Sequence, residues 1–216
     1  PPQPTPVYIP LYIGIEQGGN GNDQILSGLT PLPNQMSLGA TWSPELAVEV
    51  GQVMGSELAA LGINLYLGPT LDVADTANIE AARYAGPSLF GGDQYWVGEL
   101  GQAYVAGLHS GSQGRLSVIA RNFPGLGSAD RSPEEEVSTV RKSLEQLKQI
   151  ELAPFFTVTS AEDPASQVDG LMIAHIRFQG FQGNIRATTR PVSFDATALE
   201  QLLAVGEQPD EENERG

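Results

Sequence analysis

The chain contains no cysteine, only two histidines and few positive charges, and each shortage excludes a class of protein. Without cysteine, disulfide bridges, thiolate metal sites and cysteine nucleophiles are excluded. His109 and His175 alone give little basis for a zinc site, so we expect neither a metal nor a cofactor. No apolar run reaches the roughly 18 residues that a membrane-spanning helix needs, so we expect no membrane span.

Negative charge dominates the 216 residues, because 26 acidic residues against 11 Lys and Arg give a formal net charge of −15. Such a chain repels phosphate backbones and anionic membrane surfaces, so we expect no nucleic-acid partner. Hydrophobic residues make up 40% of the composition, which is enough for a sizeable core.

The two ends differ in composition from the rest of the chain. Residues 1–6 read PPQPTP, which favours polyproline II and predicts a linker, as in exported or cell-envelope proteins. Residues 206–216 hold five acids and no apolar side chain, which predicts a disordered tail or an acidic loop. Because the chain begins with Pro1 rather than Met, we expect a processed or excised chain whose folded part spans residues 7–205.

Four short apolar runs predict four strands, and their continuous apolarity is typical of parallel strands covered on both faces. The runs are Leu11–Ile15, Ile63–Leu67, Leu116–Ala120 and Gly170–Ile176. Helical spacing and capping residues predict the segments Ser43–Gly62, Gln94–Leu108, Ser132–Glu151 and Asp195–Val205 as helices. Four such units in series imply an α/β fold with a parallel sheet, either a doubly wound sheet or part of a (β/α) barrel.

Polar residues follow each predicted strand, where parallel α/β folds place their ligands. Glu16 and a glycine-rich stretch follow the first strand, as a ligand loop or a flexible turn. Asp72 follows the second strand and either binds a polar ligand or caps its loop. Arg121 and Asn122 end the third strand and can face a ligand. His175 ends the fourth, as a satisfied structural histidine or a functional one.

Several other patterns argue against alternative chemistries. Gly125 and Gly127 lack the third glycine of a dinucleotide loop, so we do not expect a nucleotide site. No Gly-x-Ser-x-Gly elbow and no Ser-His-Asp trio is identifiable. Asp93 is expected to be a helix N-cap rather than a ligand, and Glu134–Glu136 a solvated helix start.

At these strand ends the sequence resembles the N-terminal barrel domain of glycoside hydrolase family 3, which includes β-glucosidases and β-N-acetylhexosaminidases. The resemblance runs in order over about residues 8–204, through YIGIEQGG, LGATWSPELAVEVGQVMGSELAALG, INLYLGPTLDV, FGGD, RNFPGLG and LMIAHI. It implies a (β/α)8 barrel of TIM type that is incomplete here, because four units are about half of a barrel. Another polypeptide would then complete the barrel, or the chain would self-associate or belong to a longer protein.

The resemblance also implies a sugar pocket. The residues expected to line it are Glu16, Asp72, Arg121, Asn122 and His175. Asp72 and His175 match the family, whereas Glu16 stands where members carry Asp, and Ser88 where they carry Arg. The family motif KHFPGHG reads RNFPGLG here, so both of its histidines are replaced.

The implied activity is hydrolysis of β-linked glucosides or N-acetylglucosaminides with retention, which requires two carboxyl groups about 5 Å apart. The family's nucleophile, an Asp after the next strand, lies beyond this chain. The family's Asp and His acid/base positions look like Ser128 and Glu134, with Asp130 near, so Asp130 and Glu134 are the acid/base candidates. The alternative is a catalytically inactive carbohydrate-binding or scaffold domain, which the lost histidines favour.

Overall fold

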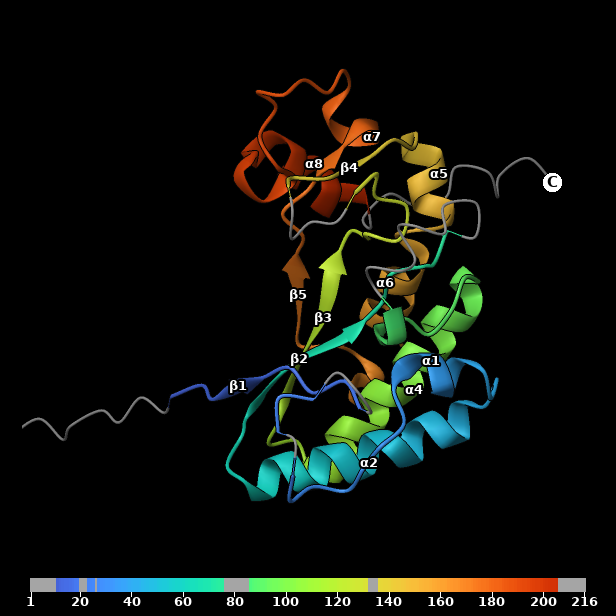
Figure 1. Ribbon diagram of the computed structural model, residues 1–216, viewed down its shortest axis with the longest axis vertical. Helices are drawn as coiled ribbons and strands as arrows, with labels where there is room; N and C mark the ends of the chain where they lie inside the picture. The colour runs from blue at the N-terminus through green and yellow to red at the C-terminus, as the bar shows by residue number, and fades with distance from the viewer. Residues whose placement is uncertain (1–10, 20–22, 26, 76–85, 132–135, 206–216) are drawn as a thin grey trace, which may run out of the picture.

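A parallel four-stranded sheet organises the part of the chain that the computed structural model describes, residues 11–19, 23–25, 27–75, 86–131 and 136–205 (Figure 1). Its strands are β1 (Gly14–Ile15), β2 (Leu65–Thr70), β3 (Ser117–Phe123) and β5 (Gly170–Ile173), in that spatial order. All three neighbouring pairs are parallel, which confirms the prediction. Within these residues the sheet stays open, with β1 and β5 at its edges.

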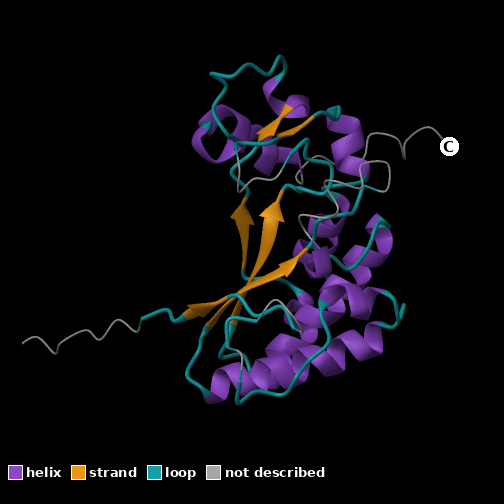
Figure 2. Cartoon of the chain, in the orientation of Figure 1, coloured by secondary structure: helices purple, strands orange, loops and turns teal. Residues whose placement is uncertain are grey.

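Three helices cover one face of this sheet, namely α2 (Pro44–Ala60), α4 (Gln94–Ser112) and α6 (Ala153–Thr159) (Figure 2). The predicted starts of α2 and α4 are confirmed. The Ser43 hydroxyl accepts the Leu46 N–H at 3.3 Å, and the Asp93 carboxylate accepts the N–H groups of Tyr95 and Trp96. Shorter helices are α1 (Gln35–Gly39), α5 (Leu144–Gln149), α7 (Gln179–Gln182) and α8 (Ala196–Ala204).

Glycines let α2 and α4 cross with their backbones in close contact. A Cβ placed on Gly51 would lie 2.5 Å from the carbonyl oxygen of Tyr104, and one on Gly107 would lie 2.3 Å from that of Val48. No side chain fits at such distances. The helical layer behind the sheet therefore depends on these small residues.

The two faces of β3 differ in burial. Val118 and Ala120 are fully buried beneath the helices, whereas Ile119 on the opposite face is half-buried. Because side chains alternate along a strand, Arg121 lies on the same face as Ile119. Arg121 therefore projects on the face of the sheet away from the helices.

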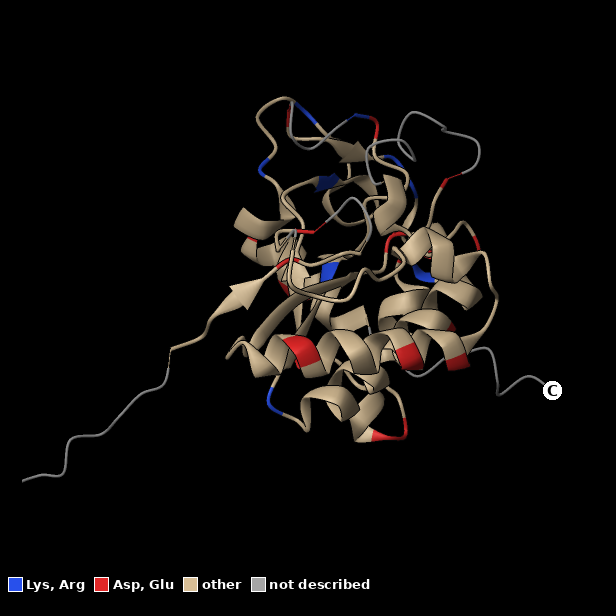
Figure 3. Ribbon diagram, turned by 60° about the horizontal axis from the view of Figure 1, so that its bottom comes forward, with Lys and Arg blue, Asp and Glu red and all other residues tan. Residues whose placement is uncertain are grey.

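A smaller unit lies beyond the carboxyl ends of β3 and β5 (Figure 1). Its short parallel strands β4 (Thr139–Val140) and β6 (Arg177–Phe178) pair with each other, and α5, α7 and α8 surround them. Of the 11 Lys and Arg residues, 10 follow residue 114, and several lie in this unit, whereas acidic residues mark the outer helix α2 (Figure 3). Positive charge is therefore concentrated beyond the strand ends.

The predicted helix Ser132–Glu151 is wrong over most of its length. Residues 132–135, including the predicted capping box and Glu134, lie outside the described residues. Thr139–Val140 forms β4, and the helix begins only at Leu144, where Ser143 and Gln146 make the capping box. The apolar spacing fits a helix, but pairing with β6 buries residues 138–140 consecutively, which an amphipathic helix cannot do.

The other predicted elements exist with shifted ends. β1 is shorter than the predicted strand Leu11–Ile15, and β5 ends before His175. The predicted linker 1–6 and tail 206–216 lie outside the described residues and stay predictions. No helix within the described ranges is long and apolar enough to cross a bilayer.

Candidate functional site

An ion pair between Glu16 and Arg121 stands at the centre of the candidate site. Glu16 follows β1, Arg121 lies near the end of β3, and only β2 separates the two strands. Arg121 Nη1 lies 2.5 Å from Glu16 Oε1, and the two side chains are 19% and 45% exposed. The Nε of Arg121 is buried, with no hydrogen-bond partner among the described residues. The partly exposed Glu16 carboxylate therefore offers an acceptor to a polar ligand beside the guanidinium of Arg121.

A small pocket adjoins this ion pair, and its wall is held rigid by hydrogen bonds. Gln35 of α1 donates its amide Nε2 to the Thr70 carbonyl at 3.0 Å, and its Oε1 accepts the Thr70 N–H at 3.3 Å. Thr70 ends β2 and pairs with Arg121 in the sheet register. Because Gln35 and Thr70 are both buried, the floor beside Arg121 is fixed before any ligand arrives.

Gln17 joins the two described ends of the segment that follows β1. Gln17 is buried, its Oε1 accepts the N–H groups of Gln24 and Ile25 at 3.0 Å, and its amide donates to the Ile25 carbonyl. The Tyr66 hydroxyl donates to the Gln17 carbonyl at 2.8 Å, and burial raises the pKa of Tyr66 to about 12. These hydrogen bonds hold Gln17, and so the position of the adjacent Glu16, which fits the ligand-loop interpretation.

Asp72 and Asn122 form the second pair, below the loop that follows β3. Asp72 is fully buried, and its Oδ2 accepts the Asn122 amide while its Oδ1 accepts the Leu126 N–H, both at 2.6 Å. Burial raises the pKa of Asp72 to about 6, against the lowering effect of these two hydrogen bonds. Of the two interpretations for Asp72, these contacts are those of a loop cap. Its predicted contact with sugar stays a prediction.

His175 lies apart from the other four predicted residues. It is exposed just beyond β5, its Nδ1 lies 2.8 Å from Ser193 Oγ, and its ring packs edge-on against Phe194 at 5.0 Å. Phe194 is itself 68% exposed. The structure therefore joins Glu16 with Arg121 and Asp72 with Asn122, and gives His175 an exposed aromatic neighbour beyond the carboxyl end of β5.

Asp130, a predicted acid/base candidate, is held by cations and backbone. Its Oδ1 accepts the Thr139 N–H at 2.9 Å, and Arg131 and Arg141 lie within 3.5 Å of its carboxylate. Partial burial acts to raise the pKa of Asp130, but this N–H and Arg131 outweigh it and lower the pKa. A carboxyl with a lowered pKa is a poor proton donor near neutral pH. The other candidate, Glu134, lies outside the described residues.

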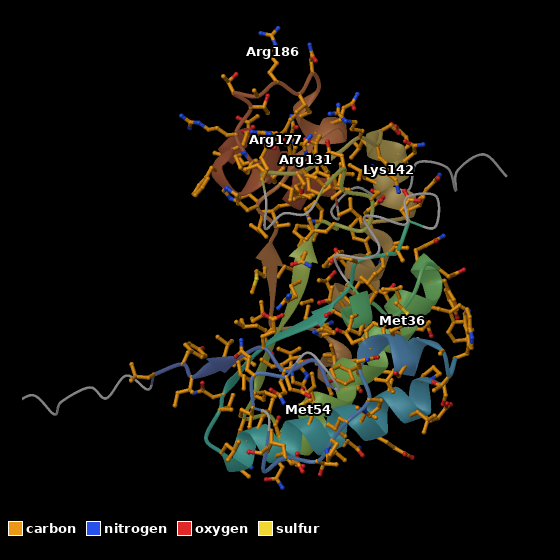
Figure 4. The ribbon with its side chains drawn as sticks, viewed as in Figure 1. Met36, Met54, Arg131, Lys142, Arg177 and Arg186 are labelled. Atoms are coloured by element: carbon orange, nitrogen blue, oxygen red, sulfur yellow. The ribbon has the colours of Figure 1, made fainter. Side chains whose placement is uncertain are left out.

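Sequence reasoning missed a buried charged cluster behind the same loop. Glu151 is fully buried, and its Oε1 accepts hydrogen bonds from Ser128 Oγ at 2.6 Å and from Lys142 Nζ. Figure 4 shows Lys142 beside α5. Glu151 looked like a polar helix end, because the predicted helix placed its apolar positions elsewhere. Only the break between α5 and α6 turns Glu151 inward.

An apolar cavity of about 240 Å³ lies on the helical side, away from these polar groups. Trp42, Trp96, Met36 and Phe90 are among its lining residues, and the two indoles meet edge-on at 5.3 Å. Asp93 also borders it but is committed to capping α4, as predicted. Within the described ranges, no group of three or more His, Asp or Glu side chains is arranged to hold a metal ion.

Comparison with protein families gives one match that covers nearly the whole chain. The model of the glycosyl hydrolase family 3 N-terminal domain matches residues 3–205. A beta-hexosaminidase of Thiobacillus denitrificans is 28% identical over 200 residues, which are 90% of this chain and 51% of that protein. One from Pseudomonas aeruginosa is 25% identical over 194 residues, 89% of this chain and 53% of that protein. The chain thus spans about half the length of the curated relatives it matches.

Solved structures give the same result for the fold. A glycoside hydrolase family 3 β-N-acetylglucosaminidase from Paenibacillus sp. str. FPU-7 superposes with a TM-score of 0.80 at 32% identity, covering 92% of this chain and 35% of that one. NagZ from Neisseria gonorrhoeae superposes with a TM-score of 0.76 at 27% identity, covering 90% of this chain and 53% of that one. The predicted parallel fold of (β/α) barrel type is therefore confirmed.

Proposed function

Because the chain belongs to glycoside hydrolase family 3 through its N-terminal domain, we propose that it forms the sugar-binding part of an enzyme that hydrolyses β-linked N-acetylglucosaminides. The relatives named above are hexosaminidases and N-acetylglucosaminidases, which supports this sugar over glucose. The observation that carries the proposal is the Glu16–Arg121 pair at the carboxyl ends of the strands, where the Glu16 side chain is 45% exposed.

Each predicted residue has a role that follows from its contacts. Glu16, nearly half-exposed, accepts hydrogen bonds from sugar hydroxyls, and Arg121 donates to a sugar oxygen. Asn122 presents its amide from the neighbouring position, and Asp72 holds that amide in place. His175 contacts the sugar from the end of β5, where exposed Phe194 offers an apolar surface beside it.

The chemistry is retaining hydrolysis, in which one carboxylate attacks the sugar and a second group protonates the leaving oxygen. In this proposal the nucleophile comes from the half of the relatives' length that this chain does not match. A second polypeptide, a further segment or self-association then closes the barrel around the sugar. Asp130 and Glu134 remain the acid/base candidates.

A catalytically inactive carbohydrate-binding domain is the second candidate function, and one observation favours it. The Asp130 carboxyl is bound to Thr139 N–H and flanked by Arg131 and Arg141, and its pKa is lowered. That environment keeps the carboxyl ionised, which suits a structural anchor better than an acid.

Binding and turnover measurements test the two functions. We expect N-acetylglucosamine to bind the chain in calorimetry, and Arg121→Met to weaken that binding at least about 10-fold, as loss of charged hydrogen bonds does. Arg186→Met is the matched control, because Arg186 is exposed at the far end of the smaller unit (Figure 4). Equal binding by both variants would refute the Arg121 site. Release of nitrophenol from nitrophenyl β-N-acetylglucosaminide by the completed barrel, against binding without turnover, separates the enzyme from the binding domain.

A further inference from the structure

The loop after β3 is fastened from two sides by buried carboxylates. On the β2 side, Asp72 accepts the Leu126 N–H at 2.6 Å. On the other side, Glu151, between α5 and α6, accepts the Ser128 hydroxyl at 2.6 Å. Both carboxylates are fully buried. Two buried carboxylates therefore hold residues 126 and 128 of this loop in place.

Glu151 also contacts the loop through its carbon stem. A Cβ on Gly125 would lie 2.8 Å from Glu151 Cβ, and Gly125 has φ of +127°, which side chains rarely adopt. The Gly125 N–H in turn donates to the Asn122 carbonyl at 2.7 Å. A displacement of Glu151 would therefore move Gly125, and with it Asn122, the residue that carries the amide at the sugar site.

The ammonium group of Lys142 compensates the negative charge of the buried Glu151 carboxylate. Its Nζ donates to Glu151 Oε1, and its side chain is only 18% exposed. The second oxygen of Glu151, Oε2, is buried without a hydrogen-bond partner among the described residues. A buried carboxylate that keeps one oxygen unpaired is costly to retain, so packing alone does not account for it.

We propose that Glu151 is a positioning residue for the sugar site, which with Lys142 holds the loop of residues 125–128 so that Asn122 faces the sugar. The inference rests on the proposed sugar-binding function. Glu151 does not touch the sugar, because it is fully buried, and it acts through Ser128 and Gly125.

The cleanest test removes the hydroxyl that links Glu151 to the loop and leaves the ion pair with Lys142 intact. In Ser128→Ala we expect the Leu126 and Ala129 amides to exchange hydrogen at least about 10-fold faster, as loss of a bond to a charged group implies. We expect N-acetylglucosamine affinity to fall several-fold, and the melting temperature to fall by only a few degrees because the chain stays folded. Ser128→Thr, which keeps a hydroxyl, should restore both readouts.

Two further variants guard against general destabilisation. Ser56→Ala removes a hydroxyl that bonds within α2, 2.9 Å from the Val53 carbonyl, and should change neither loop exchange nor affinity. Glu151→Met combined with Lys142→Met removes both charges and the acceptor of the Ser128 hydroxyl, so no buried charge is left unpaired. This double variant should stay folded and show the same weakened sugar binding as Ser128→Ala.

Each outcome decides a separate point. Unchanged exchange at Leu126 in Ser128→Ala would show that Glu151 does not anchor the loop. Faster exchange with unchanged sugar affinity would reduce Glu151 to a structural residue and overturn the positioning role. A wild-type chain that binds no sugar would refute the proposed function instead, and the exchange measurement would still decide whether Glu151 anchors the loop.

Discussion

Replacing the buried carboxylate of Asp72 by an amide, in Asp72→Asn, should change how stability depends on pH. Asp72 is fully buried, and burial raises its pKa from the ordinary 3.8 to about 6. Asparagine has the same shape and carries no charge. The Asn122 amide can turn to offer its oxygen to the new Nδ2, and the Leu126 N–H keeps an acceptor.

The direction of the effect follows from proton uptake. Between about pH 3.8 and pH 6 the folded chain holds a proton on Asp72 that the unfolded chain has lost. Stability falls with rising pH wherever the folded state binds more protons. Ionisation of Asp72 therefore costs stability as pH rises through this window. A difference of about two pKa units corresponds to about 3 kcal/mol, complete above pH 6 and absent below about pH 4.

Urea unfolding at a series of pH values from about 4 to 7 measures this effect. Relative to wild type, Asp72→Asn should gain about 3 kcal/mol in unfolding free energy between those limits. Asp195→Asn is a control of opposite sign, because hydrogen bonds from the Gln182 amide and the Ala198 N–H lower the pKa of Asp195. That variant should lose stability relative to wild type only as pH rises toward about 4, and should show almost no further change up to pH 7, where the Asp72 effect appears. A pH-independent difference for Asp72→Asn would refute the buried, raised-pKa carboxylate.

Three further predictions concern the ion pair, the helix crossing and a cap. A double-mutant cycle of Glu16→Gln and Arg121→Met should give a coupling energy of about 1 kcal/mol in unfolding free energy, because the ion pair is partly exposed. A coupling energy of zero would show that the two side chains do not form an ion pair. Gly107→Ala should cost roughly 1–3 kcal/mol in thermal or urea unfolding, whereas Gly91→Ala, with open space at its Cβ and no positive φ, should cost less, and equal costs would contradict the close crossing. Asp93→Ala should cost about 1 kcal/mol and lower helicity by circular dichroism, and an unchanged signal would argue against the cap.

Local signals predicted most of the regular structure. Ser43 and Asp93 mark helix starts because their oxygens accept free N–H groups, and that chemistry needs no tertiary partner. Continuous apolar runs predicted buried parallel strands, because a strand that is covered on both faces needs apolar residues at successive positions. The error at Ser132–Glu151 arose where local and tertiary preferences disagree, since pairing of Thr139–Val140 with β6 overrides a helical spacing.

The candidate site likewise has features that the sequence predicts and features that it does not. Parallel strands end at one edge of a sheet, so the sequence alone predicted that Glu16, Arg121 and Asn122 would gather there. It left open whether Asp72 binds or caps, because that depends on which N–H groups fold over it. The inward position of Glu151 could not be predicted for a related reason, because its contacts with Ser128 and Lys142 form only when the chain folds.

Motifs and periodicity within short segments of the sequence are enough to predict the family, the parallel direction of the strands and the strand ends where polar residues collect. How those residues pair, which carboxylates are buried, and that Glu151 turns inward to hold Ser128 and Lys142 follow only from the folded chain. Pairing and burial depend on segments distant in the chain meeting in space, and no local pattern encodes that meeting.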